Sequence, residues 1–209
     1  MKFMVEGKPF VITIVGAESS GKTTLGLDLA TETGSLFQPE FAREYLSSLG
    51  RPYDERDLEI IAEKQLEAIL AVVSRESSVV SPIVSRESSV VSKSVSREPS
   101  TVSRNVTQEF SMVSQYIKSK IVNRKSSIIV DSGMMNLRMW ARIKYGVTIP
   151  VVEDALRNDV TDLYLLCRPH VEWIPDPMRE APTLLERAWI YNQYLKELTL
   201  SPVDVEIVF

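Results

Sequence analysis

Short apolar runs alternate along the chain with longer stretches in which apolar residues recur every three or four positions. The runs at 10–15 (FVITIV), 126–131 (SSIIVD) and 163–167 (LYLLC) are rich in β-branched and aliphatic residues. This composition is typical of strands that a parallel sheet buries on both faces. Weaker runs at 35–38 and 203–209 predict two further strands, so we expect a sheet of five strands.

The helical pattern is clearest at 54–73, where Leu58, Ile61, Leu66 and Ile69 fall on one face behind an acidic first turn. Other helices are predicted over residues 22–33, 135–145, 151–158 and 184–198. Alternating strands and helices of this kind predict a three-layer α/β fold with a mainly parallel sheet and right-handed crossovers.

A repeated segment interrupts this alternation between 74 and 107. The units VSRESSVVSPI, VSRESSVVSKS and VSREPSTVSRN follow one another with a period of 11 residues, and a fourth, more divergent copy follows them. The apolar positions suit a helix of 3.67 residues per turn, which would form a long helical arm. Against this, 12 of the 30 residues from Ser74 to Ser103 are serine, and the segment contains Pro82 and Pro99. We favour a poorly ordered or partly helical insertion, with helical order returning over 108–122.

Composition narrows the possible functions. A length of 209 residues suits a single domain over 1–209, and a net charge of −4 argues against a large nucleic-acid groove. One cysteine, Cys167, excludes an intrachain disulfide, and one histidine, His170, argues against zinc sites and histidine-based triads. We find no signal-peptide core and no apolar run of about 18 residues, so we expect a cytoplasmic protein without a membrane partner.

The sequence GAESSGKT at 16–23 fits the phosphate-binding pattern G-x-x-x-x-G-K-[ST], with a buried strand before it and a helix after it. In such a loop the glycines let successive backbone N–H groups face phosphate oxygens at the N-terminus of a helix. The loop therefore predicts ATP binding and a P-loop NTPase fold. The predicted nucleotide-binding residues are Gly16, Glu18, Ser19, Ser20, Gly21, Lys22, Thr23 and Thr24.

Two further residues are candidates for phosphoryl transfer. Asp131 closes a buried strand, where a carboxylate could hold Mg²⁺ together with the Thr23 hydroxyl; the alternative is that it caps the helix beginning near Met135. Arg179 lies in the proline-rich segment WIPDPMRE, which in small P-loop kinases closes over the triphosphate. The alternative is an ordinary surface loop in which Arg179 is solvated or pairs with Glu180.

The motifs GAESSGKTTL, PEFAREYL (39–46), QLEA, VDSGMMNLRMWARIKYG (130–146) and LYLLCRPHVEWIPDPMRE (163–180) together resemble the ribosylnicotinamide kinase domain of NadR-type proteins. The resemblance covers most of the chain outside the repeat. It implies ATP-dependent 5′-phosphorylation of nicotinamide riboside, with Lys22, Asp131 and Arg179 in phosphoryl transfer. The family has a segment of the pattern EYxRE, and the acidic residue of that segment falls on Glu40 of this chain. The resemblance implies that Glu40 would orient the 5′-hydroxyl.

One departure from the family pattern affects the predicted function. The family commonly has Asp-Thr-Asp after the strand, whereas this chain has Asp131, Ser132 and Gly133, so the second carboxylate is missing. We therefore keep two alternatives: a kinase for another nucleoside or nucleotide, and an ATP-binding regulatory module without efficient turnover. The expected ligands are ATP, Mg²⁺ and a small nucleoside-like substrate, with no nucleic acid; the sequence does not define an oligomeric state.

Overall fold

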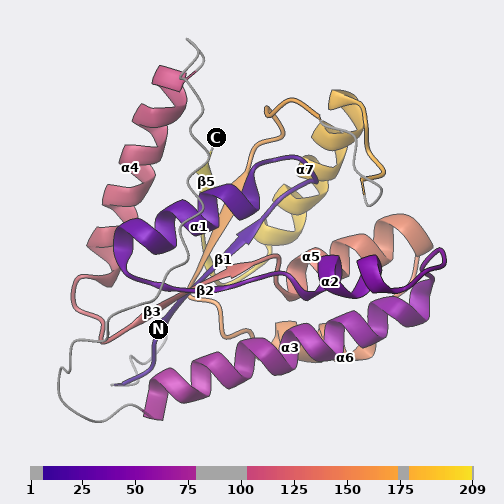
Figure 1. Ribbon diagram of the computed structural model, residues 1–209, viewed down its shortest axis with the longest axis horizontal. Coiled ribbons are helices and arrows are strands. Elements are labelled where there is room, and N and C mark those ends of the chain that lie inside the picture. Colours follow the sequence, from indigo (N-terminus) through magenta and orange to yellow (C-terminus); the bar gives the residue numbers. More distant parts are fainter. Residues whose placement is uncertain (1–6, 79–102, 174–178, 209) are drawn as a thin grey trace.

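The computed structural model describes residues 7–78, 103–173 and 179–208. A five-stranded sheet runs through its centre in the order β2-β3-β1-β4-β5, and every neighbouring pair is parallel (Figure 1). The strands are β1 (Phe10–Val15), β2 (Leu36–Gln38), β3 (Ser127–Asp131), β4 (Leu163–Cys167) and β5 (Asp204–Val208). All five strands predicted from the sequence are therefore present.

Helices cover both faces of the sheet and complete the three-layer architecture (Figure 1). They are α1 (Lys22–Thr33), α2 (Phe41–Ser48), α3 (Glu55–Ser78), α4 (Ser103–Ile121), α5 (Met134–Trp140), η1 (Ala141–Tyr145), α6 (Pro150–Arg157) and α7 (Leu184–Thr199). Helices α1 and α4 pack on one face, and the remaining helices pack on the other. This arrangement is the α/β P-loop kinase-like fold that the sequence predicts.

The core follows from the pleat of β1, whose six residues are all buried. Successive side chains of a strand point to opposite faces of the sheet. Ile12 therefore packs with Leu29 of α1 and Ile117 of α4, whereas Val11 packs with Ile61 of α3 on the other face. Burial on both faces explains why this strand reads as a continuous apolar run.

Some element boundaries differ from the prediction. The stretch 135–145 is α5 followed by the π-helix η1, not one regular α-helix. Helix α3 continues to Ser78, and α4 begins at Ser103 instead of near Gln108. The prediction that helical order returns only near Gln108 is therefore wrong, and the two ends of the proposed insertion 74–107 are helical.

Both helices are packed against the rest of the protein outside the repeat, and extending a helix that is already formed costs less than starting a new one. Val73 of α3 is buried in the core, and the Ser77 hydroxyl donates to its carbonyl oxygen within the helix. Helix α4 packs against α1 and the sheet through Ile117. The remainder of the repeat, 79–102, lies outside the described residues.

The strand order places the carboxyl ends of several strands beside one another. β1 lies between β3 and β4, and the chain leaves β1 through α1 toward β2 on the β3 side before it reaches β4 on the other side. In open α/β sheets, ligands bind at such a point of reversal, outside the carboxyl ends of the strands. The segments that follow β1, β2, β3 and β4 meet at this edge.

Candidate functional site

The loop between β1 and α1 has a backbone that depends on its glycines. Gly16 has φ 144°, and a Cβ there would lie 2.9 Å from the Cys167 carbonyl oxygen at the end of β4. Gly21 has φ 81° and precedes the first residue of α1. Both positions have a positive φ that side-chain-bearing residues adopt only with strain, so the sequence pattern corresponds to a structural requirement here.

Lys22 and Thr23 at the start of α1 have different partners. The Lys22 ammonium donates to the carbonyl oxygens of Gly16 at 3.1 Å and Ala17 at 2.8 Å, so it lies over its own loop. The Thr23 hydroxyl donates to Oδ2 of Asp131 at 2.6 Å. Asp131 thus contacts the phosphate-binding loop and does not cap the following helix, whose N-cap is Gly133 without a side-chain cap.

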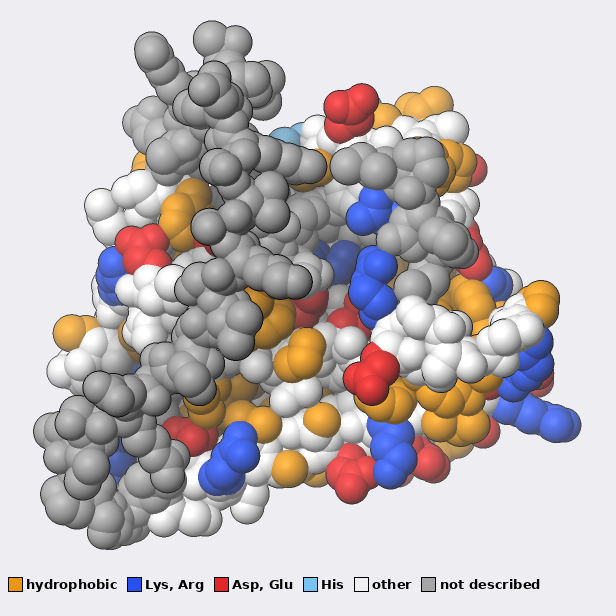
Figure 2. Space-filling model, in the orientation of Figure 1, with side chains coloured by type: hydrophobic (Ala, Val, Ile, Leu, Met, Phe, Trp, Pro, Cys, Tyr) orange, Lys and Arg blue, Asp and Glu red, His pale blue; other side chains and the backbone are white. Residues whose placement is uncertain are grey.

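A cavity of about 730 Å³ opens beside this loop. Figure 2 shows acidic and basic side chains gathered around the hollow in the middle of this face. Every predicted site residue lines this cavity except Asp131, which is buried behind Thr23. The predicted residues in its wall are Gly16, Glu18, Ser19, Ser20, Gly21, Lys22, Thr23, Thr24, Glu40 and Arg179.

Glu40 lies directly before α2, in an extended conformation with φ −70° and ψ 123°. Burial raises the pKa of its carboxyl, and nearby Asp131 raises it further, whereas Lys22, Arg43 and a hydrogen bond from Ser132 act in the opposite direction. The net effect is to raise the pKa of the Glu40 carboxyl from its ordinary value. A carboxylate with a raised pKa beside a phosphate-binding lysine is typical of a group that accepts a proton in a reaction.

A buried glutamine of α3 fixes the backbone on both sides of Glu40. Oε1 of Gln65 accepts from the Phe41 N–H at 2.7 Å, and its Nε2 donates to the Pro39 carbonyl oxygen at 3.4 Å. Gln65 is 1% exposed. Gln65 was not among the predicted site residues, although a polar side chain on the apolar face of a predicted helix was a signal for such a role.

Ser132 and Asn136 also extend the site beyond the predicted residues. Ser132 has φ 56°, and its hydroxyl donates to Oδ1 of Asp131 at 3.3 Å and accepts from Nδ2 of Asn136 at 3.0 Å. Oδ1 of Asn136 is buried and has no hydrogen-bond partner within the described part of the chain. Both residues line the cavity. Their position directly after the strand that carries Asp131 was the only sequence signal.

Gly133 accounts for the missing second carboxylate in steric terms. A Cβ at this position would lie 2.9 Å from Cγ2 of Thr13 on β1, closer than side-chain contacts allow. Thr13 in turn shares a 2.8 Å hydrogen bond with the Thr161 hydroxyl. Thr13 therefore leaves room only for glycine here, and the backbone φ of −82° is not the reason.

Aromatic and aliphatic side chains form the far walls of the cavity. They come from α5 and η1 (Met139, Trp140 and Ile143) and from α7 (Leu185, Trp189, Ile190 and Tyr194). Leu185 is 84% exposed and Trp189 is 53% exposed. An open apolar wall next to charged groups is typical of a site for a small organic ligand with a planar ring.

Glu180 connects this wall to the phosphate-binding loop. Its backbone N–H donates to Oε2 of Glu18 at 2.8 Å, and its carboxylate accepts from the Tyr53 hydroxyl at 2.7 Å and from the Lys144 ammonium. Tyr53 also accepts a 3.0 Å hydrogen bond from Nε1 of Trp140. The segment after Arg179 is therefore anchored to the loop and to the aromatic wall. The Lys144 ammonium forms an ion pair with the Glu180 carboxylate.

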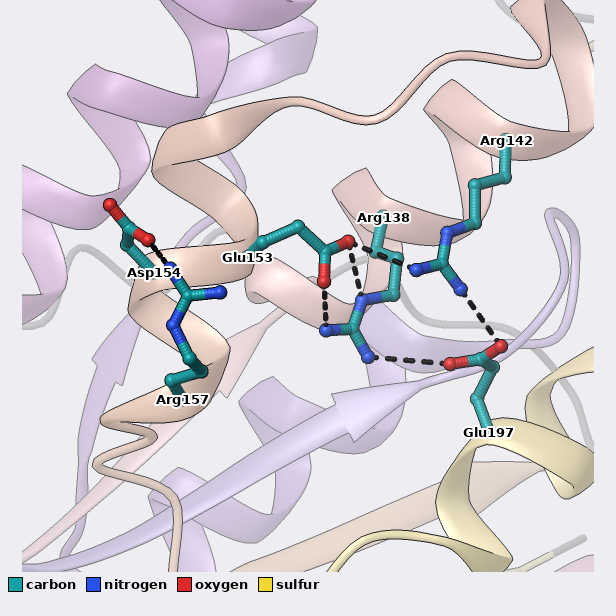
Figure 3. Close-up of polar contacts among 6 residues, drawn as sticks. All are labelled: Arg138, Arg142, Glu153, Asp154, Arg157 and Glu197. Atoms are coloured by element: carbon teal, nitrogen blue, oxygen red, sulfur yellow. Dashed lines mark hydrogen bonds and ion pairs between the residues drawn. The ribbon is translucent and has the colours of Figure 1, made fainter.

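A ring of two arginines and two glutamates fixes the helices that carry the walls (Figure 3). Arg138 forms two hydrogen bonds with Glu153 of α6, at 3.0 and 2.6 Å, and one with Glu197 of α7 at 3.3 Å. Arg142 closes the ring with bonds of 2.9 Å to Glu197 and 3.1 Å to Glu153. Bidentate, partly buried pairs of this kind define geometry more strongly than isolated surface pairs.

Three further observations concern the described part of the chain. Burial raises the pKa of the Cys167 thiol to about 12, so it stays protonated near neutral pH and is not a nucleophile. Residues 7–78, 103–173 and 179–208 contain no cluster of three or more histidine, cysteine, aspartate or glutamate side chains arranged for a metal ion. Within the same residues, no helix has the length and apolarity needed to cross a membrane.

The fold and this loop define an α/β protein of the P-loop kinase-like class. The sequence profile of the AAA domain family AAA_28 matches residues 11–80 and 100–208, and the chain belongs to this family. The profile does not match 81–99, which lie within the repeat. No curated protein sequence matches the chain significantly.

Solved structures with the same fold include NadR and a nucleotide kinase. NadR in complex with NR is 20% identical, with a TM-score of 0.58 over 95% of this chain and 45% of that chain. NadR in complex with NAD and AMP-PNP is 19% identical, with a TM-score of 0.53 over 95% and 43%. Thymidylate kinase from Ehrlichia chaffeensis is 11% identical, with a TM-score of 0.53 over 96% and 86%. The chain thus spans less than half the length of the NadR chains.

Proposed function

We propose that this protein is an ATP-dependent small-molecule kinase, and that nicotinamide riboside is its first candidate acceptor. The observation that carries the proposal is the cavity that Glu40, Lys22 and Thr23 line together, with Asp131 bonded to Thr23 directly behind it. A phosphate-binding loop and a carboxylate of raised pKa are the two groups that transfer to a hydroxyl requires.

The loop binds the phosphates of ATP in this proposal. Its N–H groups and the N-terminus of α1 face the phosphate oxygens, and Lys22 leaves the carbonyl oxygens of Gly16 and Ala17 to neutralise the β- and γ-phosphates. Arg179, in the cavity wall, stabilises the charge that develops on the transferred group. These residues act by position and charge, since phosphoryl transfer needs little covalent chemistry from the protein.

The oxygen atoms of the Thr23 and Asp131 side chains also suit Mg²⁺ as ligands. The Thr23 hydroxyl and the Asp131 carboxylate are adjacent oxygen groups, and Mg²⁺ is usually held by one or two protein oxygens together with phosphates and water. Thr23 and Asp131 would hold the ion. When bound, Mg²⁺ supplies positive charge that neutralises the phosphate oxygens.

The acceptor binds at the other end of the cavity. Glu40 orients the attacking hydroxyl and accepts its proton, and Gln65 keeps the Glu40 backbone in place through Pro39 and Phe41. The ring of the acceptor packs between Trp140 and Trp189. The bond that forms joins the acceptor oxygen to the γ-phosphorus, while the bond between the γ-phosphorus and the β,γ-bridging oxygen breaks and releases ADP.

Nicotinamide riboside is placed first because the motifs resemble the ribosylnicotinamide kinase domain and because a NadR complex with NR shares the fold. A kinase for another nucleoside or nucleotide is the second candidate, supported by the similarity to thymidylate kinase. An ATP-binding regulatory module without turnover is the third possible outcome of the test below.

The test measures ADP release from Mg-ATP by the purified protein with a panel of nucleosides and nucleoside monophosphates, including nicotinamide riboside. Lys22→Ala removes the phosphate-binding ammonium, and Arg157→Gln, on the surface of α6, is the control for loss of one positive charge. Release that depends on nicotinamide riboside and is lost only in Lys22→Ala supports the proposal. Release with a different acceptor alone supports the second candidate, and ATP binding without release for any acceptor supports the regulatory module.

A further inference from the structure

Arg187, on the N-terminal part of α7, is a buried arginine behind the phosphate-binding loop. It is 4% exposed. Its Nη1 donates to the Val171 carbonyl oxygen at 2.7 Å and to the Ser19 carbonyl oxygen at 3.4 Å. Ser19 belongs to the phosphate-binding loop, and Val171 belongs to the segment after β4, so one guanidinium connects three separate parts of the chain.

This guanidinium forms no ion pair with any carboxylate of residues 7–78, 103–173 or 179–208, and its buried Nε has no hydrogen-bond partner there. Arg138 provides a contrast, since Glu153 and Glu197 neutralise it. Removing a charge from water without an opposite charge is costly, and a protein normally compensates with an ion pair. Two carbonyl dipoles compensate Arg187 only in part.

The surroundings of Arg187 indicate an anion as the missing partner. Ser19 has φ 53°, and its buried hydroxyl also has no partner among the described residues. A Cβ at Gly21 would lie 3.6 Å from Cγ2 of Val171, so Val171 packs against the turn that leads into α1. Arg187 therefore lies immediately behind the backbone whose N–H groups face the phosphates. Its hydrogen bond to the Ser19 carbonyl polarises the Ser19–Ser20 peptide toward an anion.

We propose that Arg187 is a positioning residue for the nucleotide: its buried charge, applied through the Ser19 backbone, is balanced by the phosphates of ATP. This inference rests on the proposed function, because it assigns a further residue to the same ATP site. Arg187 also joins the loop to the segment after β4, so it fixes both edges of the nucleotide site. Arg187 acts from behind the loop and does not line the cavity.

Three substitutions of Arg187 distinguish the effect of its charge from the effect of its hydrogen bonds. Arg187→Lys keeps the charge and a donor, Arg187→Gln keeps a donor only, and Arg187→Met keeps neither. Arg157→Gln is the matched control, since that arginine pairs with Asp154 on the surface of α6. The dissociation constant of AMP-PNP is measured by isothermal titration calorimetry, and the KM values of ATP and of the acceptor are measured separately.

We expect Arg187→Gln and Arg187→Met to weaken AMP-PNP binding about tenfold, which corresponds to the loss of one nearby charge. Arg187→Lys and the control should stay within a factor of about three of the unmodified protein. The KM of ATP should rise with the dissociation constant, and the KM of the acceptor should not change. A neutral side chain at position 187 avoids the cost of burying a charge without an ion-pair partner, so we expect both neutral variants to fold.

Equal affinity in Arg187→Gln and the unmodified protein overturns the inference, and so does equal weakening in Arg187→Lys and Arg187→Gln. Failure of both neutral variants to fold also overturns it, because it assigns Arg187 to structure alone. The proposed function fails in a different way: the unmodified protein then does not bind AMP-PNP at all.

Discussion

The Thr23 hydroxyl at the start of α1 donates a 2.6 Å hydrogen bond to Oδ2 of Asp131 at the end of β3. This bond joins the phosphate-binding loop to the neighbouring strand, and both groups are oxygen donors of the kind that Mg²⁺ binds. Asp131 is 1% exposed, so its carboxylate is kept in one orientation. The relationship explains why removal of this carboxylate should affect catalysis more than folding.

We predict that Asp131→Asn lowers kcat about 10²-fold or more, because the amide keeps the hydrogen-bonding shape but loses the charge. The melting temperature should change little. The measurement is the steady-state rate as a function of Mg²⁺ concentration, beside thermal unfolding of the same preparation. A large loss of stability with unchanged activity per folded molecule would contradict the assignment.

Gly133 leads to a prediction about packing. Gly133→Ala should destabilise the protein by about 1–3 kcal/mol, the usual cost of overpacking, since the new Cβ would lie 2.9 Å from Cγ2 of Thr13. Thr13→Ser removes that methyl group and keeps the hydroxyl that bonds Thr161. The double variant Gly133→Ala/Thr13→Ser should recover most of the loss. Urea unfolding of the four proteins measures the coupling, and strictly additive effects would be evidence against the contact.

We predict that Glu40→Gln raises the stability of the protein and lowers its activity. Its folded pKa lies above its unfolded pKa because of burial, so the folded state binds more protons between these two values. The free energy of unfolding contributed by Glu40 therefore falls as pH rises through this window. Glu40→Gln should raise the melting temperature at pH 7 and have a smaller effect at pH 4.

The same substitution should lower kcat by about 10²- to 10⁴-fold, the range typical of a general base. The acid limb of the kcat/KM profile should report a pKa above the ordinary glutamate value and should disappear in Glu40→Gln. Unchanged kcat would remove Glu40 from the mechanism, whatever its effect on stability.

The pKa of Asp57, at the start of α3, is shifted in the opposite direction to that of Glu40. The Arg51 guanidinium forms two hydrogen bonds with it, at 2.7 and 2.8 Å, and together with the Asp54 N–H lowers the pKa of the Asp57 carboxyl to about 2. The pair's contribution to stability is complete above the unfolded aspartate pKa and is lost as pH falls toward 2. Arg51→Gln should lower the free energy of unfolding at pH 7 and have a much smaller effect at pH 2.5, where the Asp57 carboxylate is largely protonated in the unfolded state. Urea unfolding at both pH values tests this.

Local sequence specified most of the framework of this protein. The apolar runs predicted all five strands. The three strongest runs became β1, β3 and β4, which are buried along their whole length, and a strand buried on both faces has to be apolar throughout. Helix α1 ends at Thr33, as its sequence pattern predicted, and Gly34 follows with φ 70° and an N–H that donates to the Ala30 carbonyl oxygen. The loop could be recognised in the sequence because the backbone conformation at Gly16 and Gly21 has a positive φ that favours glycine.

The surroundings of the site depended on contacts between distant segments. The weak helix propensity of serine and valine did not stop α3 at Val73, because adding residues to a helix that is already formed costs less than starting one. Gln65 lies 26 positions from Pro39, and Arg187 lies 168 positions from Ser19. No sequence pattern predicts contacts between residues that lie so far apart along the chain.

The sequence by itself determined the class of fold and the position of the glycine-containing loop at 16–23, since these follow from hydrophobic period and from glycine conformations that act within a few residues. Only the tertiary structure decided that Asp131 contacts Thr23, that Gly133 is packed against Thr13, and that Arg187 lies uncompensated behind the loop. The physical reason is that burial, desolvation and ion pairing are properties of positions in space, which the packing of the helices on the sheet creates.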